Sequence, residues 1–347
     1  MNQEGQDILV QAAPLHEFAT ALYQKAGVNR EHAKLMADLQ VETDLRSVHS
    51  HGTRMIPWYV RSILDGAMNP SPAIRVVQEG PGFAVIDGDN GLGHPPSALA
   101  MQMAIEKARS AGIAAAGVRN AGHFGAAACY TMMAVEAKMI GFSTTNTGGP
   151  SVAAPGAAEP VVTNNPLSYA LPAGEERPIV LDMACGASAW GKVRTLQMYG
   201  IPIPPGWLLT TDGKPTQDPN EGKILTPAGG PRGYGLALTM GILAGPLVGG
   251  LMATAKQGDA TSEHFFIAMN VASFTDYDEY AAAIDQGIRA IQAAKPVEGV
   301  DQVYLPGEIE WRKREVWVDS GIPLHVGHLR DLASLAEELK VDICWEW

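Results

Sequence analysis

The order of the predicted secondary structure constrains the fold more than any other feature of this sequence. Apolar residues recur every three to four positions in residues 8–26, which is typical of an amphipathic helix, and residues 324–339 are helix-like again. Between these ends, short β-rich runs alternate with helical segments, beginning with a predicted hairpin at residues 74–87. We therefore expect an α/β fold with a mixed-sheet domain and a helical domain built from N- and C-terminal segments.

The domain boundaries follow from the positions at which this pattern changes. Asn29 is predicted to cap a helix that continues to about residue 47, and the Pro/Gly-rich residues 201–232 predict an extended loop. We expect five consecutive parts: N-terminal helices in 1–73, an α/β domain in 74–232, a core helix in 233–260 that returns to the helical domain, a continuation of the α/β domain in 261–304, and C-terminal helices in 305–347.

Charge and composition argue against several classes of protein. With a formal net charge of −12 and no run of Lys and Arg, the chain is not expected to bind nucleic acid. The most apolar stretch, residues 235–252, is interrupted by glycines and a proline, so it predicts a buried helix and no membrane span. The three cysteines are widely spaced and favour neither a disulfide scaffold nor a metal cage. Because the N-terminus also lacks the features of a signal peptide, we expect a cytoplasmic protein.

The common nucleotide-binding motifs are missing from the α/β region. Gly88, Gly91 and Gly93 do not have the G-x-G-x-x-G spacing of a Rossmann fold, and no P-loop sequence is present. A nucleotide cofactor, if the chain binds one, must therefore bind to a different scaffold.

The densest group of chemically capable side chains lies in residues 44–54, DLRSVHSHGTR, near the end of a predicted helix. His51 has Ser50 and Arg54 close by in sequence. A histidine titrates near neutral pH, so His51 could transfer a proton to or from a developing alkoxide. A histidine that caps a helix would give the same pattern.

Further candidates follow predicted strands. His123 lies in residues 119–125, RNAGHFG, directly after a β-run and at the start of a helix, where backbone N–H groups can bind an anion. Asp182 ends the apolar run IVLD; it could cap the next turn or orient a histidine. Residues 229–235 form a Gly-rich loop with one cation, Arg232, which suits a phosphate or a simple entry into a helix.

Seven motifs occur together in one order: DLRSVHSHGTR, IDGDNGLGH, RNAGHFGAAACY, TNNP, LDMA, GGPRGYGLAL and LPGE. From about residue 10 to 325 the sequence thereby resembles the malate/L-lactate dehydrogenase family, the type-2, non-Rossmann NAD(P)H-dependent reductases of 2-oxo acids. This family includes ureidoglycolate, sulfolactate and diketogulonate enzymes and a cyclic-imine carboxylate reductase. The resemblance is specific for the family but not for the substrate.

The resemblance implies a homodimer with a distinctive NAD(P)-binding α/β domain, and an active site between the two domains. It implies that His51 is the acid/base catalyst and that Ser50 and Asp182 form a relay with it, while His123 is catalytic or orients the substrate. Arg54 and His49 become candidates for binding the substrate carboxylate. The implied cofactor contacts are His123, Asn146, Thr147, Asn165, Pro166, Asp182, Met183, Ala184, Arg232, Gly233, Pro306, Gly307 and Glu308.

Three positions depart from the family pattern. Many members have an arginine four residues after the catalytic histidine, whereas Arg54 comes three residues after His51, a rotation of about 100° on a helix. Arg232 replaces a lysine, which keeps the charge but changes its geometry. His49 stands where the family often has an aspartate, and it brings a second imidazole close to the proposed acid.

The expected function is therefore reversible hydride transfer between NAD or NADP and C2 of a small 2-hydroxy acid or 2-oxo acid. A small-molecule carboxylate is the expected substrate, and no metal is required. Alternatives are a reductase of a cyclic imino acid, or a cofactor-binding family member without dehydrogenase turnover. A metal-dependent hydrolase that uses His49, His51 and His123 is a weaker alternative, because no companion carboxylate has ligand spacing.

Overall fold

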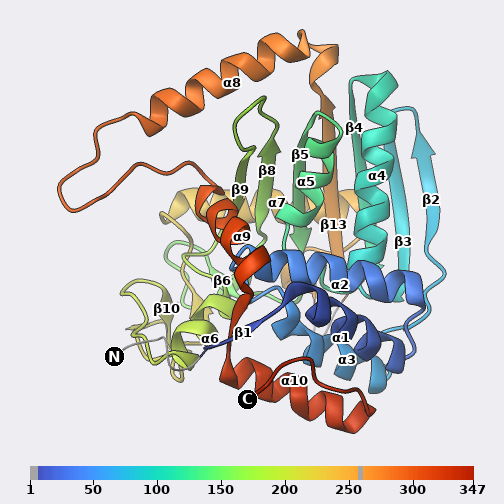
Figure 1. The fold of residues 1–347 in the computed structure, drawn as a ribbon, viewed down its shortest axis with the longest axis vertical. Helices are drawn as coiled ribbons and strands as arrows, with labels where there is room; N and C mark the ends of the chain where they lie inside the picture. Colours follow the sequence, from blue (N-terminus) through green and yellow to red (C-terminus); the bar gives the residue numbers. More distant parts are fainter. Residues whose placement is uncertain (1–6, 257–260) are drawn as a thin grey trace.

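The computed structural model describes residues 7–256 and 261–347, and it confirms the mixed α/β fold (Figure 1). The α-helices are α1 Ala12–Lys25, α2 Arg30–Leu45, α3 Ile56–Leu64, α4 His94–Ala111, α5 Ala128–Glu136, α6 Trp190–Met198, α7 Pro231–Ala244, α8 Tyr277–Gln292, α9 Glu308–Ser320 and α10 Val326–Leu339. Short 3₁₀ turns are η2 Thr53–Met55, η3 Pro246–Val248, η4 Ala253–Ala255 and η5 Val271–Ser273.

The strands form three sheets. The strands of the large sheet are β2 Arg75–Gly80, β3 Phe83–Gly91, β4 Ile113–Ala121, β5 Met139–Asn146, β8 Leu167–Leu171, β9 Ile179–Met183 and β13 Ser262–Asn270. A smaller sheet contains β6 Val152–Ala153, β7 Pro160–Val162, β10 Leu208–Leu209, β11 Pro215–Thr216 and β12 Ile224–Leu225. The third sheet pairs β1 Asp7–Val10 with β14 Ile322–His325.

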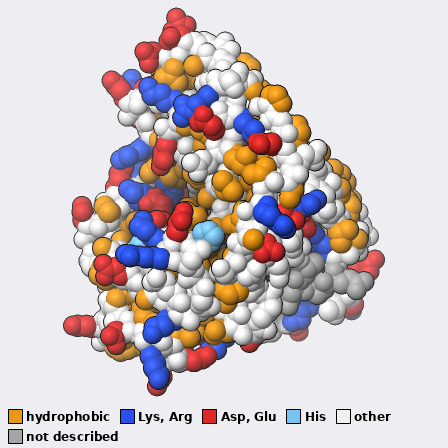
Figure 2. All heavy atoms as spheres, turned by 90° about the vertical axis from the view of Figure 1, so that its right-hand side faces the viewer, with side chains coloured by type: hydrophobic (Ala, Val, Ile, Leu, Met, Phe, Trp, Pro, Cys, Tyr) orange, Lys and Arg blue, Asp and Glu red, His pale blue; other side chains and the backbone are white. Residues whose placement is uncertain are grey.

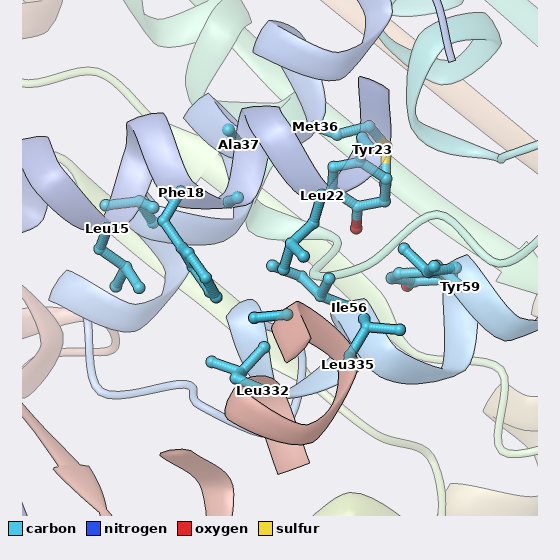
Figure 3. Packing of buried hydrophobic residues seen from close by; sticks show 14 of the residues in the cluster. Leu15, Phe18, Leu22, Tyr23, Met36, Ala37, Ile56, Tyr59, Leu332 and Leu335 are labelled. Atoms are coloured by element: carbon cyan, nitrogen blue, oxygen red, sulfur yellow. The ribbon is translucent and has the colours of Figure 1, made fainter. Parts of the chain in front are cut away.

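The helical unit combines both ends of the chain. Helices α1, α2 and α3 pack with α10 around one apolar core, in which Phe18, Tyr59 and Leu332 are buried (Figure 3). The side chain of Asn29 accepts a hydrogen bond of 2.9 Å from the backbone N–H of His32, so the predicted cap of α2 is confirmed. This arrangement leaves the last turn of α2 and the loop that follows it facing the large sheet's domain.

The N-terminal helix is shorter than the sequence predicts. Residues 8–26 were expected to be one helix, but α1 begins at Ala12 because residues 7–10 pair antiparallel with residues 322–325. The predicted helix at residues 324–339 likewise begins two residues late, at Val326. Strand pairing between segments so far apart in sequence leaves no local signal in either one.

The large sheet has the order β2-β3-β4-β13-β5-β8-β9, with β3 and β4 parallel and the other neighbours antiparallel. Successive side chains of β13 point to opposite faces. Phe266 packs in the apolar core with α4 and α5, whereas Phe265 and Ile267 contact the core that includes residues of α7. Helices therefore cover both faces of the sheet, with α7 behind it in Figure 1.

Helix α7 does not return to the helical domain, as residues 233–260 were expected to do. It packs against β5, β13 and β7, and Ala237 and Met240 are buried with Phe142 of β5. Its apolar sequence suits burial against either domain, so only the tertiary contacts decide its place. Residues 257–260 of the predicted segment lie outside the described residues.

Residues 201–232 are more regular than the predicted loop. They contain β10, β11 and β12, each of two residues, which form the smaller sheet together with β6 and β7. Strands this short have too few residues to show a period of two, so the sequence pattern could not identify them.

No helix in the described residues is long and apolar enough to cross a membrane. Acidic, basic and hydrophobic side chains are interspersed over the face that Figure 2 shows. Recognition of a charged ligand on such a surface depends on individual side chains and not on a broad field of one sign.

Candidate active site

A cavity of about 1220 Å³ lies where the helical unit meets the large sheet. Its walls come from α2 and the loop after it, from residues 123–133, from the ends of β5 and β9, from the start of α6, and from residues 306–314. Ligand pockets commonly measure roughly 300–1,000 Å³, so this cavity is large enough for a dinucleotide together with a small acid.

The loop after α2 is organised around the carboxylate of Asp44, which is completely buried. Its oxygens accept hydrogen bonds from the Thr53 backbone N–H (2.8 Å) and hydroxyl (2.5 Å), and one lies 2.8 Å from Nδ1 of His49. A Cβ on Gly52 would overlap this carboxylate, so the loop can close only over a glycine. Burial alone would raise the pKa of Asp44, but the bond with His49 and the other partners outweigh it and hold the pKa below its usual value.

His51 projects from this loop into the cavity wall. Its Nδ1 lies 2.9 Å from the hydroxyl oxygen of Ser50, which leaves Nε2 for exchange with a ligand. Burial lowers the pKa of His51 to about 4, so the imidazole is neutral at pH 7. The ring stacks near that of His123, with 5.6 Å between centroids.

His123 is oriented by a residue that the sequence analysis missed. The hydroxyl of Tyr59 donates to Nδ1 of His123 at 2.6 Å, and the N–H of Gly125 approaches the same nitrogen at 3.3 Å. Burial raises the pKa of Tyr59, so it stays a donor, and burial beside His51 lowers the pKa of His123. Since Nδ1 accepts, the proton of the neutral ring lies on Nε2, as a hydrogen-bond donor. In sequence, Tyr59 looks like an ordinary core position of α3.

Asp182 lines the same cavity but is not joined to His51 by a hydrogen bond within the described residues. Its Oδ2 accepts the backbone N–H of Ala128, at the start of α5, at 2.9 Å. The carboxylate is open to the cavity yet enclosed by protein, and this desolvation raises its pKa to about 6. In this geometry the partner of His51 is Ser50, and the carboxylate that supports the loop is Asp44.

The implied cofactor residues fall into two groups. In the first, Gly307 adopts a φ of 84°, and a Cβ there would meet the backbone of Val180. Residues of the first group line the cavity: His123, Thr147, Pro166, Asp182, Met183, Ala184, Pro306 and Gly307. Residues of the second group do not line it: Asn146, Asn165, Arg232, Gly233 and Glu308.

Three members of the second group support the cavity walls instead. The side-chain amide of Asn165 donates to the carbonyl of Ala237 at 2.7 Å, and that of Asn146 donates to the carbonyl of Leu251 at 2.8 Å. The carboxylate of Glu308 accepts the N–H of Leu305 at 3.1 Å and so fixes the turn that carries Gly307.

The two predicted substrate-binding residues point elsewhere. The guanidinium of Arg54 donates to the hydroxyl of Thr195 on α6 at 2.7 Å, and Arg54 does not line the cavity. His49 pairs with Asp44 and stacks near Trp317 of α9, with 5.7 Å between ring centroids. The arginines on the cavity wall, which the sequence analysis did not single out, are Arg46, Arg194 and Arg314.

No group of three or more His, Cys, Asp or Glu side chains in residues 7–256 and 261–347 is arranged to hold a metal ion. The chemistry that the cavity offers is proton exchange at neutral imidazoles beside a space large enough for an extended cofactor.

The chain is similar in sequence and structure to dehydrogenases of 2-hydroxy acids. Malate dehydrogenase from Pyrococcus abyssi is 35% identical over 343 residues, covering 94% of each chain. L-sulfolactate dehydrogenase from Methanocaldococcus jannaschii is 38% identical over 329 residues, covering 92% of this chain and 94% of that protein. A solved structure of sulfolactate dehydrogenase from the same organism matches with a TM-score of 0.88 and 34% identity, covering 96% of this chain and 98% of that chain. The family described as malate/L-lactate dehydrogenase matches residues 10–333, and the chain therefore belongs to this family.

Proposed function

We propose that His51 is the acid–base catalyst of this enzyme, an NAD(P)-dependent oxidoreductase that moves hydride between nicotinamide and C2 of a small 2-hydroxy acid or 2-oxo acid. The observation that carries the proposal is the position of His51: on the cavity wall, neutral, and with Nδ1 engaged by Ser50. This leaves Nε2 as the nitrogen that exchanges a proton with the substrate.

In the oxidation direction, Nε2 of neutral His51 takes the proton of the substrate hydroxyl. The cofactor, when bound, supplies the hydride acceptor or donor. Ser50 holds the imidazole in one orientation, and Nε2–H of His123 donates to the substrate oxygen. In the reduction direction, protonated His51 returns the proton to that oxygen. Asp44 does not touch the substrate, but it holds the loop that carries His51 in place. Asp182 lines the cavity, where it can contact the cofactor.

The residues on the cavity wall fit the cofactor. Gly307 brings the turn before α9 close to β9 on the cavity wall, and the wall offers both carboxylate and guanidinium groups to ribose and phosphate. The substrates named for the relatives, malate and sulfolactate, each carry a second anionic group besides the carboxylate. We expect this chain to act on substrates of the same class. Arg194 lies on the cavity wall, and Gly191, one turn earlier in α6, contacts Ser50, so we expect Arg194 to bind an anionic group of the substrate.

The test of the acid–base role is the substitution His51→Asn. We expect it to lower kcat roughly 100- to 10,000-fold, because loss of a general acid–base typically costs this much. Turnover is followed at the NADH absorbance with a panel of 2-hydroxy acids, 2-oxo acids and cyclic imines against both cofactors. NADH binding, measured by fluorescence, should stay near the wild-type value.

His32→Asn is the matched control, since His32 is a histidine on the outer side of α2, away from the cavity. Near-wild-type turnover in His51→Asn would contradict the acid–base role. A parallel loss of NADH binding would show that His51 is structural.

We further propose that the enzyme works as a homodimer in the cytoplasm. The segment of residues 236–251 leaves Leu236, Ile242, Leu247 and Leu251 exposed by 40, 44, 58 and 54%. Several large apolar side chains exposed on one segment are typical of a protein–protein contact, and we assign them to a second copy of this chain. The three cysteines are free thiols, which fits a reducing compartment.

A further inference from the structure

Arg46 is a buried cation with an unusual lack of partners. It directly follows the last residue of α2, and only 6% of its surface is exposed. Its guanidinium lies 4.0 Å from the ring centroid of Trp311 on α9, but neither terminal nitrogen has a hydrogen-bond partner within the described residues. Buried charged groups are normally paired, so a site that leaves one unpaired calls for an explanation.

The carboxylates near Arg46 do not fill this gap. Glu42 is engaged by Arg314, at 2.6 Å, and Asp182 accepts the N–H of Ala128. Glu310 influences Arg46 only electrostatically. Burial lowers the pKa of Arg46, but a guanidinium stays protonated in proteins, so both terminal NH₂ groups remain charged and without a hydrogen-bond partner among the described residues.

Arg46 lines the large cavity, and its two terminal nitrogens are covered by protein in the ligand-free chain. A guanidinium presents its donors as a planar fork that matches two oxygens of a phosphate or carboxylate. The indole of Trp311 covers the other side of the fork and holds it in place. The structure therefore places an unpaired guanidinium directly behind the cavity wall, where a small shift of the wall would bring its donors to an anion in the cavity.

The enzyme must bind two anionic groups, the carboxylate of its substrate and the diphosphate of its cofactor, and the position of Arg46 indicates which of them it binds. The carboxylate of a 2-hydroxy acid is attached to the reacting carbon, so it must lie beside His51. Arg46 stacks on Trp311 of α9, with 4.0 Å from its guanidinium carbon to the ring centroid, whereas the ring of His51 stacks near that of His123, with 5.6 Å between centroids. Arg46 thus belongs to a different part of the cavity, where the remote portion of an extended ligand would lie.

We propose that Arg46 binds the diphosphate of the dinucleotide cofactor through its two free nitrogens. Asp182, on the same part of the wall, then accepts a hydroxyl group of the adjoining ribose. This inference rests on the cofactor class of the family and is independent of the acid–base role of His51.

The test is the substitution Arg46→Met, which keeps an apolar stem against Trp311 and removes the charge. We expect the Kd for NADH, measured by fluorescence titration, to rise about 10- to 100-fold, because charged hydrogen bonds to phosphate are lost. The Kd for ADP-ribose, which keeps the diphosphate, should rise in parallel, whereas the Kd for adenosine should stay unchanged in calorimetry. Arg46→Lys should fall between wild type and Arg46→Met, since an ammonium keeps the charge without the fork.

The stability of the ligand-free protein separates binding from a structural role. Removal of an unpaired buried charge should leave the Tm of Arg46→Met unchanged or raised. Arg61→Met is the control: Arg61 lies on α3, pairs with Glu338 and does not line the cavity, so we expect at most a twofold change in the Kd for NADH.

Three results would overturn the proposal. A marked fall in Tm with equal weakening of adenosine and ADP-ribose would make Arg46 structural. An unchanged Kd for NADH would exclude the diphosphate, and if the KM for the hydroxy acid rose instead, Arg46 would be the substrate's anchor. Failure of the His51→Asn experiment would leave all of these binding results intact, so the two proposals can be judged separately.

Discussion

His51 differs from a free histidine in the range of pH over which it can act as a base. Its surroundings provide a hydroxyl, from Ser50, and a second neutral imidazole, from His123, but no carboxylate hydrogen-bonded to its ring within the described residues. Burial without a compensating anion lowers the pKa to about 4. The base form is therefore fully populated across the physiological range.

This shift predicts the pH dependence of the two directions. For oxidation of the hydroxy acid, kcat/KM requires neutral His51. In an Asp182→Asn background, which removes the carboxylate whose pKa is raised to about 6, it should be flat from pH 6 to 8 and fall only as the pH drops towards about 4. For reduction it requires protonated His51, so kcat/KM should decrease about tenfold per pH unit above that pKa. Initial rates in both directions over a series of overlapping buffers check this. A midpoint near 6.5 for oxidation would contradict the prediction, because it would belong to an ordinary solvated histidine.

At the scale of elements, α2 and the loop after it are held together by buried hydrogen bonds. Asp44 in the last turn of α2 fixes Thr53 across the loop, and Gln40 donates to the carbonyl of Gly52 at 3.1 Å. His328 of α10 lies 3.2 Å from the hydroxyl of Thr53, which ties the loop to the end of the chain. The orientation of His51 thus depends on buried contacts that do not themselves touch a substrate.

Gly52→Ala should disrupt these contacts. The added methyl group would overlap the carboxylate of Asp44, so we expect a loss of stability of about 1–3 kcal/mol and a lower kcat. Thermal unfolding and steady-state kinetics measure both effects. Gly287→Ala in α8 is the control: nothing lies within 4 Å of the added Cβ, and this variant should be neutral or slightly more stable. A Gly52→Ala enzyme with wild-type Tm and kcat would show that the loop does not need this closure.

The elements that the sequence predicted well are those with local signals. The cap at Asn29 and the apolar spacing of α2 lie within one segment, so they could be recognised without knowledge of the fold. The pairing of β1 with β14 and the packing of α7 on the sheet could not be recognised, because both depend on residues far away in sequence.

The site residues also divide into those with a local sequence signal and those that depend on distant contacts. His51, Ser50, His123 and Asp182 were found from motifs, and all four line the cavity. Tyr59, Asp44 and Arg46 become significant only in the folded chain. Tyr59 donates a hydrogen bond to a ring nitrogen of His123, and the carboxylate of Asp44 lies under the loop. The terminal nitrogens of Arg46 have no hydrogen-bond partner among the described residues. Arg54 carried the right charge in the expected motif, but it points towards α6.

At the scale of the whole molecule, the proposed dimer can be tested with one substitution. Leu247→Asp places a charge among the exposed apolar side chains of residues 236–251, so we expect the dimer to dissociate into monomers. Sedimentation velocity measures the change in mass. Val297→Asp is the control, because Val297 is exposed by 74% in the connection between α8 and α9. A Leu247→Asp protein that remains dimeric would place the interface elsewhere.

The antiparallel pairing of β1 with β14 has a consequence for the way in which the protein is made. During synthesis α1, α2 and α3 emerge from the ribosome first, and their partners β14 and α10 emerge only after every strand of the large sheet. The sheet domain can assemble in between, while the N-terminal helices wait for residues that do not yet exist. Because the hydroxyl of Thr53 contacts His328 of α10, the loop that carries His51 cannot complete its buried contacts until α10 has been made.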